Sequence, residues 1–114
     1  MSLQIKSLKQ TTVPSDVEDD IYAVPANKSA IIKSIRLVNK GTAPATVNLF
    51  VNRGETTSYH IVPKDLSLLP GMAFVDDGEL TLEGLSADGD VLTGVASPSG
   101  STVDCVISGV ERDV

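Results

Sequence analysis

Few side chains in this sequence are of the types that carry out chemistry, and they do not form a recognisable catalytic set. Among 114 residues there is one histidine, His60, and one cysteine, Cys105. Catalytic triads need a base oriented by a fixed partner, and zinc sites need several His or Cys ligands. One His and one Cys cannot supply either arrangement alone. We therefore expect His60 to be an exposed or hydrogen-bonded histidine on a strand, and we predict no catalytic, cofactor-binding or metal-ligating residue.

Cys105 lies in an alternating run in which it shares its parity with Val103 and Ile107. This pattern predicts a small buried hydrophobic residue. A reactive thiol would need a base or a helix N-terminus nearby, and the only histidine is far away in the sequence. A lone cysteine also excludes a disulfide within the chain.

Two acidic clusters are the remaining candidates for chemistry. Asp76 and Asp77 with Glu79, together with Asp88-Gly89-Asp90, could offer oxygen ligands to Ca²⁺. The spacing of an EF-hand is absent, and Asp and Gly are favoured in turns for backbone reasons. Turns are therefore the preferred interpretation, with Ca²⁺ as the open alternative. A glycosidase pair of carboxylates is disfavoured because two Tyr and two Phe provide few aromatic side chains for a sugar groove.

The elements that would position these residues are strands. No window keeps apolar residues at helical spacing, while nine Gly and six Pro divide short apolar alternations. The pattern predicts an all-β, antiparallel β-sandwich of the jelly-roll type with about eight strands. We expect one folded domain, residues 21–114, preceded by an N-terminal arm or edge strand, residues 1–20. The expected strands are 3–8, 21–24, 29–39, 46–51, 57–62, 65–69 (or a single turn), 72–75, 79–85, 91–96 and 102–110.

Two strands have patterns with further consequences. In residues 29–39 the alternation changes phase around Lys33, which indicates a β-bulge there or a strand covered on both faces. In residues 46–51 the aliphatic side chains share one parity, and Phe50 has the other. Phe50 therefore belongs to a second packing layer or to a subunit interface.

Charge limits the possible partners. Nine basic and fifteen acidic residues give a formal charge of −6, which disfavours binding to nucleic acid. No apolar run approaches the roughly 18 residues of a membrane span, and no apolar segment of a signal peptide is visible. We expect a protein made and used from the cytoplasm. The basic residues of 28–53 either give the protein one positive face or are scattered solvated charges.

The stretch 21–111 resembles small β proteins of tailed-phage virions. The resemblance is carried by Tyr22-Ala23-Val24-Pro25-Ala26-Asn27-Lys28, a "VPA-x-K" turn, by the Ile-rich strand and Asn39-Lys40-Gly41-Thr42 after it, and by the ending, residues 89–92 and 106–111. It implies a non-enzymatic bacteriophage virion structural protein without cofactors, assembled in the host cytoplasm. Capsid decoration (cement) proteins of this kind are often jelly-roll homotrimers that bind the major capsid protein of the assembled head.

The residues themselves fit this implication in two ways. An acidic protein suits the outside of a shell better than the side that faces packaged DNA, and a trimer would bury leftover apolar side chains such as Phe50 and Phe74. We expect the 1–20 segment and the loops at one end to dock on the shell. The alternative is a tail- or fibre-associated module that binds a host receptor or carbohydrate, for which Tyr22 and Tyr59 are the available aromatic residues.

Overall fold

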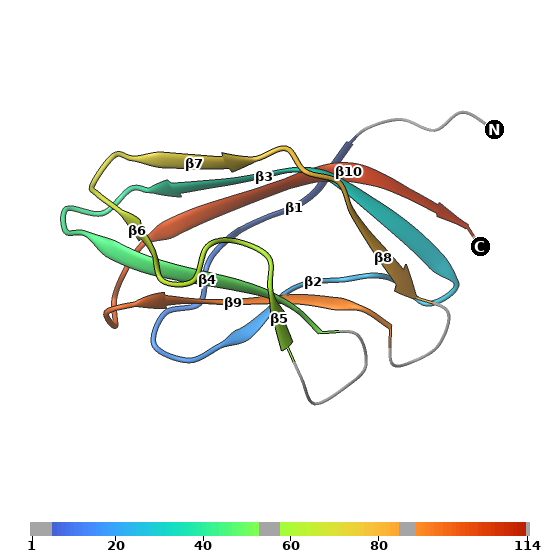
Figure 1. The fold of residues 1–114 in the computed structure, drawn as a ribbon, viewed down its shortest axis with the longest axis horizontal. Coiled ribbons are helices and arrows are strands. Elements are labelled where there is room, and N and C mark those ends of the chain that lie inside the picture. Colours follow the sequence, from blue (N-terminus) through green and yellow to red (C-terminus); the bar gives the residue numbers. More distant parts are fainter. Residues whose placement is uncertain (1–5, 53–57, 85–88, 114) are drawn as a thin grey trace.

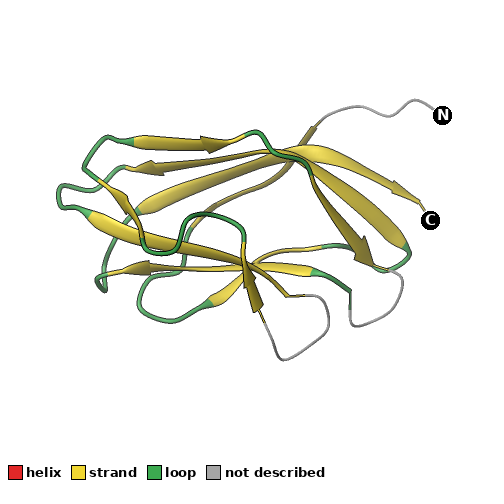
Figure 2. Cartoon of the chain, viewed as in Figure 1, coloured by secondary structure: helices red, strands yellow, loops and turns green. Residues whose placement is uncertain are grey.

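The computed structural model describes residues 6–52, 58–84 and 89–113, and all regular elements within them are β-strands (Figures 1 and 2). The strands form two packed antiparallel sheets, which confirms the all-β sandwich. The described residues therefore contain no helix that could cross a membrane. The strands are β1 (Lys6–Thr12), β2 (Asp19–Ala23), β3 (Lys28–Asn39), β4 (Ala45–Asn52), β5 (Ser58–His60), β6 (Leu66–Leu68), β7 (Ala73–Asp76), β8 (Leu80–Gly84), β9 (Val91–Ser97) and β10 (Val103–Asp113).

The order of the strands is that of a jelly roll. Sheet A has the order β1-β10-β3, and β7 and β8 share the next position because each pairs with one half of β3. Sheet B has the order β2-β9-β4, and β5 and β6 share the position beyond β4 in the same way. Ten strands thus occupy the eight strand positions of a jelly roll, which reconciles the count with the expected number of about eight.

The predicted irregularity at Lys33 is confirmed as a β-bulge. Ser34 pairs with Ser108 and Ile32 pairs with Gly109, so Lys33 is the extra residue on β3. A Cβ at position 109 would lie 2.1 Å from the carbonyl oxygen of Ile31, so only glycine fits opposite the bulge. The bulge explains the change of phase, because Ile32 and Ile35 can then both be buried.

The core lies between the sheets and consists almost entirely of aliphatic side chains. The clean alternation of β4 places Val47, Leu49 and Val51 inward, and each is at most 4% exposed. Cys105 lies on the opposite sheet and is 1% exposed, as its parity predicts. Burying each such side chain stabilises the fold by about 1.5–3 kcal/mol. Phe74 also packs against this core, opposite Leu37, so it is not the leftover surface side chain that was expected.

The segment before residue 21 is part of the sandwich from Lys6 onward. β1 is the edge strand of sheet A, and β2 is the edge strand of sheet B. Between them Val13 is 1% exposed, and its backbone N–H donates to the carbonyl oxygen of Val103 at 2.8 Å. Removal of residues 1–20 would therefore take away an edge strand and part of the core. The sequence predictions for Leu3, Ile5, Arg53, Leu85 and Asp88 concern positions outside the described residues.

Candidate functional site

The histidine and the cysteine considered for chemistry lie in different sheets. His60 is exposed on β5 of sheet B, where its ring lies 4.6 Å from the ring of Phe50. Cys105 lies on β10 of sheet A and faces the core, and burial raises the pKa of its thiol to about 12. A thiol with a raised pKa is a poor nucleophile because little thiolate is present near neutral pH. His60 and Cys105 therefore do not form a nucleophile and base pair.

The carboxylates that were considered for Ca²⁺ also lie apart. Asp76 lies opposite Ile35 in the strand pairing of β7 with β3. Asp90 is hydrogen-bonded to Glu83, which lies opposite Ser29 at the other half of β3. Six residues of β3 separate these points, a distance of about 20 Å in a strand. Each carboxylate has a local structural role: Asp76 accepts from the Gly78 N–H at 2.8 Å, and Asp90 accepts from the Glu83 N–H at 2.9 Å. Among the described residues no group of three metal-ligating side chains is found.

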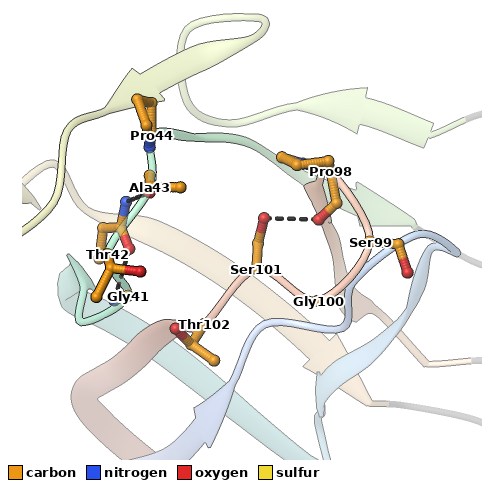
Figure 3. A pocket seen from close by; sticks show the side chains of 10 residues that line it. Gly41, Thr42, Ala43, Pro44, Pro98, Ser99, Gly100, Ser101 and Thr102 are labelled. Atoms are coloured by element: carbon orange, nitrogen blue, oxygen red, sulfur yellow. Dashed lines mark hydrogen bonds between the residues drawn. The ribbon is translucent and has the colours of Figure 1, made fainter.

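The hollow at one end of the sandwich is built from two loops, residues 40–44 and 98–102 (Figure 3). Its volume is about 270 Å³, and small side chains and backbone line it. Asn39, 1% exposed, holds the first loop: its Nδ2 donates to the carbonyl oxygens of Ala43 at 2.9 Å and Leu68 at 3.0 Å. Its Oδ1 accepts from the Gly41 N–H at 2.9 Å. The hollow offers hydroxyls and carbonyls but no titratable side chain.

The VPA-x-K turn that carries the phage resemblance has a structural role. Asn27 has a φ of 63°, and its N–H donates to the carbonyl oxygen of Gly84 at 2.6 Å. The Lys28 N–H donates to the carbonyl oxygen of Pro25 at 3.2 Å, which closes the turn between β2 and β3. A Cβ at position 84 would lie 2.4 Å from that same oxygen. The motif is therefore explained by the packing of this turn over β8.

The outer face of sheet B is mainly polar. On β4 the outward-facing side chains are Thr46, Asn48, Phe50 and Asn52, which alternate with the buried ones. Phe50 is partly covered by His60, so Phe50 forms a small second layer of packing on this face. Asn48 exchanges two hydrogen bonds with Asp65, and the Thr93 hydroxyl donates to Glu18 Oε2 at 2.7 Å. These polar groups are satisfied within the chain.

The outer face of sheet A is different, and we call its centre the Arg36 face: Arg36, Val38, Ala73, Val75 and Val106. Arg36 stands between Val106 of β10 and Val75 of β7 in one row across the sheet. The next row across the sheet holds Asp104 of β10, Val38 and Ala73, and Asp104 forms an ion pair with Lys40. Val75 is 42% exposed and Val106 is 37% exposed. Exposed valines on both sides of an arginine are typical of the centre of a protein interface.

Arg36 also stands out from the other basic residues of the 28–53 region. Lys33 pairs with Glu79 at 2.5 Å, and Lys40 pairs with Asp104 at 3.0 Å. Within the described part of the chain, Arg36 has neither an ion pair nor a side-chain hydrogen bond. Among the described basic residues of that region, Arg36 is therefore the one without a local partner. The sequence analysis missed Arg36 as a site, although its parity opposite to Ile35 and Leu37 marks it as outward-facing.

Comparison with known proteins places the chain by its fold only. No protein-family model matches the sequence, and no curated protein matches it. A solved structure from the study "Bacillus endospore appendages form a novel family of disulfide-linked pili" is similar, with a TM-score of 0.51 and 16% identity. The similarity covers 100% of this chain and 92% of the other. At this identity the match supports the two-sheet architecture and carries no residue roles.

Proposed function

We propose that this chain is a non-enzymatic structural protein that acts by binding to other protein subunits. The observation that carries this proposal is the contrast between the two outer faces of the sandwich. Sheet B satisfies its polar groups internally, whereas sheet A presents Val75 and Val106 to solvent around Arg36. Exposed aliphatic side chains that flank an arginine without a local ion pair are expected where another protein docks.

Within this class, we propose a capsid decoration protein of a tailed-phage virion that binds the assembled head from outside. The VPA-x-K turn, the jelly-roll order of strands and the net charge of −6 support this assignment. Such a protein binds the assembled shell better than free capsid subunits, and it stabilises the shell by mass action. Many identical copies then turn weak single contacts into a large total effect.

The structural neighbour also belongs to a protein assembly, a disulfide-linked pilus. An assembly of the present chain would be held differently. Its single cysteine, Cys105, lies in the core at 1% exposure, out of reach of a neighbouring subunit. The contacts between copies, or with a scaffold, would therefore be non-covalent while the sandwich is folded.

The receptor- or carbohydrate-binding alternative has less support. Of its two aromatic candidates, Tyr59 is 49% exposed, whereas Tyr22 is buried and donates from its hydroxyl to Glu111. A sugar is usually held against an exposed aromatic face together with polar groups that converge on it. One exposed tyrosine at the end of sheet B does not provide that surface.

The test is co-sedimentation of the purified full chain with undecorated shells assembled from the major capsid protein encoded in the same genome. Saturable binding to shells, absent with unassembled capsid subunits, is the expected result. The bound chain should also raise the temperature at which the shells dissociate. Lack of binding to shells would overturn the decoration proposal, and binding to a glycan array instead would favour the receptor-binding alternative.

A further inference from the structure

The segment that joins β1 to β2 has a surface complementary to the Arg36 face. Val17 is 69% exposed, the highest value among the large hydrophobic residues that the structure describes as exposed. It lies within a run of four acidic residues, Asp16, Glu18, Asp19 and Asp20, all exposed. Val17 is not part of the hydrophobic core of its own chain. We call residues 16–20 the acidic segment.

The acidic segment is held in place by backbone and side-chain contacts. The Asp16 N–H donates to the carbonyl oxygen of Ala96 at 3.0 Å, and Glu18 accepts the hydroxyl of Thr93 at 2.7 Å. Asp19 accepts from the Asp20 N–H at 2.8 Å. The carboxylates of Asp16 and Asp20 have no cationic partner among the described residues. The segment therefore presents Val17 and two uncompensated carboxylates on an ordered support.

These two surfaces cannot meet within one chain. The Arg36 face is the outer side of sheet A. The connection between β1 and β2 leads from sheet A to sheet B and lies next to sheet B (Figure 1). A contact between them must therefore join two copies. We propose that the Arg36 face binds the acidic segment of a second copy of this chain, with Val17 on the valines and Asp20 on the Arg36 guanidinium.

Charge complementarity favours this occupant over the same face of a second copy. A two-fold contact of sheet A against sheet A would bring two Arg36 guanidinium groups together near its axis, and like charges in an interface oppose binding. The acidic segment offers opposite charge and an apolar side chain in one run. Because the two patches differ, the contact is head-to-tail. Successive copies then form a closed ring if the rotation between neighbours adds up to a full turn, and an open chain if it does not. The expected homotrimer would be one such ring.

The size of the surface predicts the strength of the contact. Residues 34–38 of β3 and the three strand positions of β10, β3 and β7 span roughly 16 Å by 14 Å, which gives about 230 Å². A stable complex buries about 800 Å² on each partner. A single contact should therefore be weak and visible as self-association at high protein concentration. This inference goes beyond the proposed function because it requires no capsid.

Charge reversal in the full chain tests the proposal. Arg36→Glu and Asp20→Lys should each weaken self-association in sedimentation velocity by about tenfold or more, since each places like charges across the contact. The double variant, with both charges exchanged, should recover association, and so should an equimolar mixture of the two single variants. Association should also weaken with added salt. Arg112→Glu is the matched control, because it makes the same charge change on β10 opposite Ser29, far from Arg36 along the sheet.

Each outcome decides the question. The affected side chains are exposed, so unchanged circular dichroism and thermal unfolding should show that every variant folds. A wild-type chain that stays monomeric at all concentrations would overturn the proposal, as would self-association that survives Arg36→Glu or is not recovered by the double variant. If a monomeric chain binds shells and Arg36→Glu abolishes that binding, the face serves the shell instead. The decoration proposal would then stand while this one fails.

Discussion

Asn39→Asp is a change of one side-chain group whose effect follows directly from the structure. The amide Nδ2 donates to the carbonyl oxygens of Ala43 and Leu68, and the side chain is 1% exposed. A carboxylate keeps the acceptor for the Gly41 N–H but turns an oxygen toward two carbonyl oxygens. Each buried polar group left without a partner costs about 1–3 kcal/mol, so the variant should lose about 2–6 kcal/mol. This is a large part of the total stability of about 5–15 kcal/mol expected for such a domain.

Urea unfolding followed by far-UV circular dichroism measures this loss as a lower midpoint at an unchanged slope. Burial and the facing carbonyl oxygens raise the pKa of the new carboxyl in the folded state above its unfolded value. The variant should therefore recover stability as the pH falls toward the unfolded value of about 4, where the protonated group can donate again. Asn27→Asp, an exposed site with a φ of 63°, is the matched control and should change the midpoint little. If both variants lost the same stability, Asn39 would not be the group that holds the 40–44 loop.

Three further predictions concern the core and the carboxylates. Gly84→Ala should destabilise the fold more than Gly94→Ala. A Cβ at 84 would lie 2.4 Å from the backbone oxygen of Pro25, whereas a Cβ at 94 would meet the movable side-chain ends of Ile21 and Leu49 at 2.6 and 2.7 Å. Equal unfolding midpoints in urea would contradict this prediction. Cys105 should react with a thiol reagent near pH 8 only as fast as the protein unfolds. Burial raises the pKa of the Cys105 thiol to about 12, so the free energy of unfolding should fall as the pH rises from about 9 toward about 12. This pH-dependent loss of stability should be absent in Cys105→Val. Rapid labelling of the thiol in the folded chain would refute its burial. Addition of Ca²⁺ or of a chelator should leave the melting temperature unchanged, since Asp76 and Asp90 cap local backbone groups about 20 Å apart; a clear rise with Ca²⁺ would restore the metal interpretation.

The sequence predicted the parts of the fold that depend on local alternation. Val47, Leu49 and Val51 repeat every second residue, and a strand with one buried face demands that pattern. The bulge at Lys33 was visible as a change of phase in the same signal. The strands 72–75 and 79–85 were predicted, but their shared position beside β3 was not, because strand pairing across the sheet is a long-range property. Phe74 was misassigned as a surface residue for the same reason, since its direction depends on its pairing with Leu37.

The candidate interface shows why function was harder to predict than fold. Arg36, Val75 and Val106 come from three strands that are far apart in the sequence, and only the register brings them into one row. Alternation marks each of them as outward-facing, but most outward-facing residues are simply solvated. What distinguishes these three is their adjacency, together with the local ion pairs of Lys33 and Lys40, whereas Arg36 has no such partner among the described residues. Val17 carries the complementary signal, an apolar residue among four acidic ones, but its 69% exposure is known only from the structure. The proposed contact joins the Arg36 face of one copy to the acidic segment, with Val17 at its centre, of another. The charge-reversal variants Arg36→Glu and Asp20→Lys test that contact directly.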